Sequence, residues 1–122
     1  MTISELAGRA GIRPSRIRYY ESVGVLPPPT RRFGARRYDD SAVEKLRSVL
    51  VAQRLGLSLA DIRAVASGER DLADVAMEHA RELGATIRRA RIRLALLRHA
   101  AQTTQLSAER YERILAKAEV LA

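Results

Sequence analysis

The sequence contains no cysteine and no tryptophan, and only one phenylalanine and four tyrosines among its 122 residues. The absence of cysteine excludes disulfides, thiolate metal sites, iron–sulfur clusters and cysteine nucleophiles. The chain has two histidines and shows no Ser/His/Asp arrangement, phosphate-cradling glycine loop or paired-carboxylate pocket. We therefore predict a protein that is not an enzyme and that has no metal site and no cofactor.

Long apolar runs are also absent. No segment approaches the roughly 18 apolar residues of a membrane-spanning helix, and the first residues lack the apolar stretch of a signal peptide. Hydrophobic residues make up 47% and charged residues 30%, which is ordinary for a folded domain and argues against disorder. We expect a cytoplasmic protein with no membrane partner and a core of Leu, Ile, Val and Ala.

The positive charge is concentrated in the N-terminal third. The formal net charge is +8, and residues 1–38 hold eight arginines against two glutamates. Residues 39–70 are balanced, with five basic and five acidic side chains. Because a basic surface attracts polyanions, nucleic acid is the first expected partner, and its binding surface is expected within residues 1–38.

The N-terminal segment has the signals of two short helices. Thr2 and Glu5 have the spacing of a capping box, and Gly11 is suited to end the helix that they begin. Pro14 fits the first turn of a second helix, which Gly24 ends. Two helices separated by about three residues that include a glycine predict a helix-turn-helix.

A hairpin and two further helices are expected next. Residues 26–38 contain three consecutive prolines, which exclude a helix, and arginine-rich arms on both sides of Gly34. This pattern predicts a small two-stranded wing. Asp39 is expected to cap a third helix, and Ser58 a short fourth one.

Residues 71–101 predict one long helix with a coiled-coil seam. Its apolar residues recur in steps of three and four over about four heptads. A helix of about 30 residues extends roughly 45 Å, too far for a domain of this size to cover, so we predict a partner helix from a second chain. The seam comprises Ala73, Ala76, Ala80, Leu83, Ile87, Ala90, Leu94, Leu97 and Ala101, and those from Ala76 onward are the candidate dimerisation residues.

The chain after the long helix predicts one more helix. Residues 102–107 interrupt the pattern, and Ser107 is suited to begin a final helix. We expect that helix to pack on a second apolar stripe, at Ile92 and Leu96. The predicted fold is mostly α: a winged helix-turn-helix domain at residues 1–70, a dimerising coiled coil at 71–101 and a short effector or capping segment at 102–122.

The second helix and the wing carry the candidate DNA contacts. A helix that enters the major groove needs polar and basic side chains on its outer face, and each phosphate that a cation neutralises makes binding more sensitive to salt. A merely solvated basic surface is the alternative, which the neighbouring helix-turn-helix disfavours. The candidates are Ser15, Arg16, Arg18 and Tyr19 on the helix and Arg31, Arg32, Arg36 and Arg37 on the wing.

Four ordered motifs resemble the MerR family of regulators. They are IRYYE at 17–21, GVLP at 24–27, GARRY at 34–38 and GLSLADI at 56–62. The resemblance implies an antiparallel coiled coil between two subunits and a pseudo-palindromic operator. It also implies distortion of a promoter spacer so that RNA polymerase can use it, which would make sequence recognition depend partly on deformation energy.

The resemblance also assigns individual residues. It implies that Arg18, Tyr19 and Arg36 contact DNA, and that Tyr38 either contacts phosphate or packs in the core. Thr2 completes the candidate DNA-binding set. Ala35 stands where the family has a wing tyrosine, so one aromatic contact is missing.

The effector end leaves alternatives open. Metal-sensing relatives use cysteines near the end of the long helix, where this chain has none. His79 and His99 lie off the seam and are interpreted as solvated. The arginines of the 88–98 stretch are interpreted as a solvated flank of the coiled coil, with anion binding as the alternative. The chain could be a regulator that responds to a small molecule, an effector-independent repressor or architectural protein, or a protein–protein adaptor. Of these three alternatives, only the adaptor predicts that the chain binds no operator.

Overall fold

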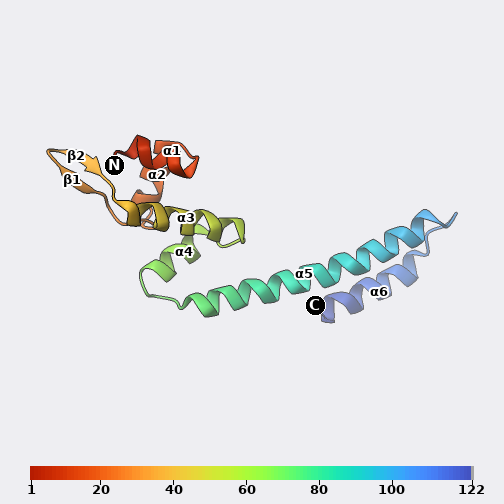
Figure 1. Ribbon diagram of the computed structural model, residues 1–122. Helices are drawn as coiled ribbons and strands as arrows, with labels where there is room; N and C mark the ends of the chain where they lie inside the picture. The colour runs from red at the N-terminus through yellow and green to blue at the C-terminus, as the bar shows by residue number, and fades with distance from the viewer. Residues whose placement is uncertain (122) are drawn as a thin grey trace. The chain divides into compact units, whose positions relative to one another are not determined.

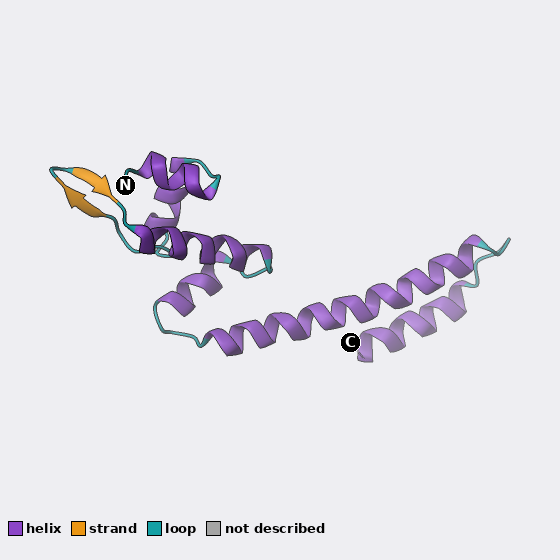
Figure 2. Cartoon of the chain, in the orientation of Figure 1, coloured by secondary structure: helices purple, strands orange, loops and turns teal. Residues whose placement is uncertain are grey.

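The computed structural model describes residues 1–121 and confirms the predicted mostly helical fold with a two-stranded wing (Figures 1 and 2). The chain divides into two compact units, with the boundary between Ala76 and Met77. The three-part division at residues 70 and 101 stays a prediction. The elements are α1 (Ile3–Ala10), α2 (Pro14–Ser22), β1 (Thr30–Arg32), β2 (Ala35–Arg37), α3 (Asp40–Arg54), α4 (Leu59–Ala66), α5 (Leu72–Ala101) and α6 (Ala108–Leu121).

Local signals begin and end the first two helices as predicted. The Thr2 hydroxyl accepts a hydrogen bond of 3.2 Å from the Glu5 N–H, and Gly11 ends α1 in the left-handed conformation at φ 70°. Pro14 occupies the first turn of α2, whose N-cap residue Arg13 makes no side-chain capping bond. The short turn between α1 and α2 confirms the helix-turn-helix.

One apolar core joins the helices of the first unit. Leu6 of α1, Ile17 of α2 and Leu46 of α3 are almost wholly buried, and Ile62 of α4 joins the same cluster. Tyr20 is buried beside them and donates a 2.6 Å hydrogen bond from its hydroxyl to Gln53 Oε1. Burial of these side chains fixes which face of α2 remains in solvent.

Capping side chains determine where α3 and α4 begin. Asp39 accepts hydrogen bonds from the Ser41 hydroxyl and the Ala42 N–H, and these bonds hold the pKa of its carboxyl below the usual value. Ser58 caps α4 as predicted, and it forms a reciprocal capping box with Asp61. Each cap satisfies backbone N–H groups that have no partner within the helix.

The wing is a hairpin with a two-residue turn. Thr30 pairs with Arg37, Arg31 with Arg36 and Arg32 with Ala35. Phe33 and Gly34 form the turn, both with positive φ, at 52° and 78°. Turns of this kind favour Asn-Gly or Asp-Gly, because the left-handed conformation costs roughly 1–2 kcal/mol for other residues.

In the second unit, α6 packs on α5 where the sequence predicted (Figure 1). The Tyr111 hydroxyl donates a 3.2 Å hydrogen bond to the Leu96 carbonyl, and Ile92 and Leu96 are both half-buried. His99, interpreted from the sequence as solvated, contacts the Tyr111 ring edge-on and shares a hydrogen bond with its hydroxyl. None of the helices among residues 1–121 has the length and apolar character to cross a bilayer.

Candidate nucleic-acid interface

The outer face of α2 is polar and open to solvent. Ile17 and Tyr20 point into the core, and the residues between and before them point outward. The hydrophobic periodicity of α2 therefore places a compact polar surface on one side of the helix. The exposed residues of α2 are Ser22, near its end, and the four predicted candidates, Ser15, Arg16, Arg18 and Tyr19.

The two arginines of this face differ in how many contacts their side chains make within the protein. The Arg16 guanidinium lies over the Tyr20 ring, 5.4 Å from its centroid, and Nη2 donates a 3.3 Å hydrogen bond to Gln53 Oε1. The Arg18 side chain is exposed and makes no hydrogen bond or ion pair with the side chains or backbone that the structure describes. Arg18 is thus the side chain of α2 that can reorient toward a ligand at least cost.

A nearly buried carboxylate attaches the wing to α2. The Glu21 side chain is 7% exposed, and it accepts an ion-paired hydrogen bond from Arg36 Nη1 and a 3.0 Å hydrogen bond from the Tyr38 hydroxyl. Charge-assisted bonds of this kind are stronger than neutral ones, and they offset part of the cost of burying the carboxylate. The wing is therefore held beside α2 by a three-residue network.

This network changes the interpretation of two predicted DNA contacts. Arg36 Nη1 and the Tyr38 hydroxyl both donate to Glu21, so these residues also position the wing, and their contacts with DNA stay predictions. Partial burial raises the pKa of the Tyr38 hydroxyl, and its hydrogen bond to the Glu21 carboxylate acts in the same direction. Glu21 itself was not among the predicted site residues, because nothing local in the sequence separates it from a solvated glutamate.

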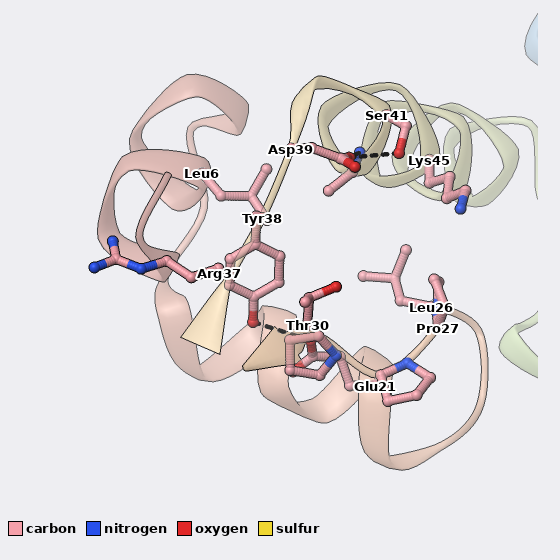
Figure 3. A pocket seen from close by; sticks show the side chains of 13 residues that line it. Leu6, Glu21, Leu26, Pro27, Thr30, Arg37, Tyr38, Asp39, Ser41 and Lys45 are labelled. Atoms are coloured by element: carbon pink, nitrogen blue, oxygen red, sulfur yellow. Dashed lines mark hydrogen bonds between the residues drawn. The ribbon is translucent and has the colours of Figure 1, made fainter. Parts of the chain in front are cut away.

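The other wing arginines are exposed. Arg31 Nη1 donates a 3.3 Å hydrogen bond to the Gly34 carbonyl, and the Arg32 guanidinium lies 5.6 Å from the centroid of the Phe33 ring. Arg37 is exposed and is among the residues that line the hollow at the base of the wing, but its guanidinium points away from the other lining side chains (Figure 3). The wing thus presents three cations to solvent and uses the fourth to attach itself to α2.

A hollow of about 200 Å³ lies at the base of the wing (Figure 3). Leu6, Leu26, the three prolines and Tyr38 line it, and Lys45 contributes a cation. Because the base of the wing is not packed solid here, the Glu21 network and the stiff proline segment set the wing's direction.

Thr2 lies at the edge of the first unit. It is half-buried, and its hydroxyl oxygen already accepts the capping bond from Glu5. The hydroxyl hydrogen is the part of this side chain that a phosphate oxygen could still accept. Thr2 stays a predicted contact.

The family model of MerR HTH family regulatory proteins matches residues 1–69. The chain belongs to the MerR family. The family consists of transcription regulators and not of enzymes, which confirms the predicted class. The match covers the helix-turn-helix, the wing, α3 and α4.

Curated relatives agree with this assignment. The mercuric resistance operon regulatory protein of Serratia marcescens is 43% identical over 63 residues, which cover 51% of this chain and 44% of that protein. The ZntR homologue of Haemophilus influenzae, an HTH-type transcriptional regulator, is 32% identical over 100 residues, covering 81% of this chain and 74% of that protein. The matched part of the chain spans less than half the length of the mercuric regulator.

A solved structure has a similar fold. It is the crystal structure of HiNmlR, described as a MerR family regulator lacking the sensor domain, bound to promoter DNA. The TM-score is 0.57 at 25% sequence identity, over 82% of this chain and 91% of that one.

We predict that Tyr38→Phe lowers the free energy of unfolding by about 1–2 kcal/mol at neutral pH, because it removes one hydrogen bond to the Glu21 carboxylate. The folded state raises the pKa of Tyr38, so this stabilisation should be complete below about pH 10 and be lost as the pH rises further. Urea titrations of both proteins between pH 7 and pH 11 would measure the difference. A difference that stays constant across that range would contradict the assignment.

Proposed function

We propose that this chain is a transcription regulator that binds a pseudo-palindromic promoter operator as a homodimer and distorts the promoter spacer. The observation that carries the proposal is the exposed polar face of α2 beside a wing that Glu21 holds in place. An α-helix fits the major groove, and adjacent cations fit the phosphates on its borders. The promoter DNA bound to HiNmlR supports the same ligand for this chain.

The distribution of free cations supports duplex binding. Arg18 on α2 and Arg31, Arg32 and Arg37 on the wing are all exposed. We assign Arg18 to base-edge or phosphate contact within the major groove and the wing arginines to the backbone beside it. Binding should weaken steeply with salt, since each phosphate contact releases counterions.

The seam of α5 supports a homodimer. All nine seam residues are exposed in the single chain, while α6 covers the neighbouring stripe at Ile92 and Leu96. Leu83 is 58% and Leu97 65% exposed, unusual for the apolar positions of a heptad pattern. A second copy of α5 offers the same seam, and the alanines between the leucines allow the two helices to approach closely. We therefore propose an intersubunit coiled coil, and the resemblance to the MerR family implies that it is antiparallel.

A two-fold dimer explains the remaining features of the proposal. It places two copies of α2 on two half-sites separated by whole helical turns, which is why a palindromic operator is expected. Bending or untwisting the DNA between them makes affinity depend on spacer deformability. RNA polymerase at the same promoter is the protein partner that such a distortion would serve.

An effector-independent regulator is the second candidate, and one observation favours it. The similar solved structure is of a regulator described as lacking the sensor domain, and this chain covers 91% of it.

Arg18→Ala should weaken specific DNA binding by about 1–3 kcal/mol if Arg18 contacts a base edge. The probe is a duplex selected by the wild-type protein from a random library, and the readout is fluorescence anisotropy over a range of salt concentrations. Arg113→Ala is the matched control, because it removes one exposed cation from α6. Equal affinities for the two variants would remove Arg18 from the contact surface. Failure of the wild-type library to enrich any duplex would overturn the proposed function.

Leu83→Asp or Leu94→Asp should produce monomers that bind the full selected duplex poorly, because each places a charge inside the seam. Leu106→Asp is the control, since Leu106 is exposed in the loop before α6 and outside the seam. Sedimentation equilibrium reports the oligomeric state. Dimers of normal stability in the two seam variants would refute the seam.

The second candidate predicts that no small molecule from a broad metabolite panel raises the melting temperature. A ligand that binds only the folded state at 100 times its Kd adds about 2.7 kcal/mol of stability, which a thermal scan detects. A reproducible, concentration-dependent rise would instead identify an effector-responsive regulator.

A further inference from the structure

The tip of the wing carries an aromatic ring that the fold does not use. Phe33 is the only phenylalanine in the chain, and it is 96% exposed. It occupies the first turn position at φ 52°, where turn chemistry favours Asn or Asp. Neither core packing nor turn formation therefore accounts for this residue, and strained positions of this kind concentrate at functional sites.

The surroundings of Phe33 are basic. The Arg32 guanidinium lies over the ring, 5.6 Å from its centroid, and Arg31 and Arg37 are exposed on the two strands behind it. An apolar ring within a rim of cations complements a surface with anionic edges and an apolar interior. A DNA groove has phosphates on both borders, and the apolar part between them is the stacked faces of the base pairs, which become accessible where a base step opens.

The attachment of the wing indicates which ligand the ring meets. Arg36 and Tyr38, at the base of the hairpin, are bonded to Glu21 of α2, so the wing is fixed to the helix proposed to enter the major groove. A wing beside that helix extends over the sugar–phosphate backbone toward the adjoining minor groove of the same duplex. This common attachment favours DNA over a separate acidic protein as the partner of the tip.

We propose that the Phe33 ring enters the minor groove beside each half-site and acts as an apolar wedge that contributes to DNA distortion. This inference rests on the proposed DNA-binding function. Phenylalanine side chains inserted from the minor groove partly unstack base steps and kink the duplex. Ala35 stands where the family has a wing tyrosine. Phe33 is therefore the only aromatic residue of the two strands and their turn.

The first test compares Phe33→Asn and Phe33→Tyr with the wild type on the duplex selected by the wild-type protein. Phe33→Asn should bind about tenfold more weakly, the typical effect of losing one aromatic ring stacked on a base. Its melting temperature should be unchanged or higher, because Asn suits positive φ. Phe33→Tyr should restore most of the affinity, and Leu106→Asn, which removes an exposed apolar side chain elsewhere, should bind like the wild type.

The second test assigns the groove. Inosine in place of guanine removes only the amino group in the minor groove and leaves the major-groove pattern intact. At guanines flanking each half-site, the wild type should prefer the inosine duplex severalfold, since the wedge then meets no amino group. Phe33→Asn should bind both duplexes equally.

Each result decides the question. Wild-type affinity in Phe33→Asn would overturn the proposal, and so would weakened binding that keeps the preference for inosine, because the ring would then lie outside the minor groove. A wild-type protein that binds no duplex would instead refute the DNA-binding function itself, so the two failures are distinguishable.

Discussion

The buried carboxylate of Glu21 is the interaction on which the arrangement of the first unit depends. A carboxylate at 7% exposure is costly unless donors surround it, and here one guanidinium and one hydroxyl do so. Among residues 1–121 no buried side-chain nitrogen or oxygen lacks a hydrogen-bond partner. Because both donors come from β2 and the residue after it, satisfying one charge on α2 also fixes the direction of the wing.

This attachment divides the wing into two parts with different roles. At the base, Arg36 and Tyr38 are half-buried and bonded within the protein. At the tip, Phe33 and its neighbouring arginines are exposed and have no role in the core. A rigid base and a free tip are what a contact element needs, since preorganisation lowers the entropy lost on binding.

The second unit shows a similar division on one helix. Tyr111 of α6 bonds to the Leu96 carbonyl, so one stripe of α5 is covered within the chain. The other stripe has the regularity of a coiled coil and remains exposed from Ala73 to Ala101. The mercuric resistance regulator extends beyond its matched region, so the similarity to it does not identify an effector for this chain.

The sequence by itself determined the helices, their ends and their buried faces, because capping pairs, prolines, glycines and apolar spacing act over a few residues. It also placed the wing and the family motifs correctly. Only the tertiary structure decided which of two neighbouring arginines, Arg36 or Arg37, bonds within the protein and which remains exposed. Alternation along β2 turns Arg36 toward Glu21, 15 residues earlier in the chain, and leaves Arg37 in solvent. That choice depends on how the strand lies against α2, a relation that local sequence does not specify.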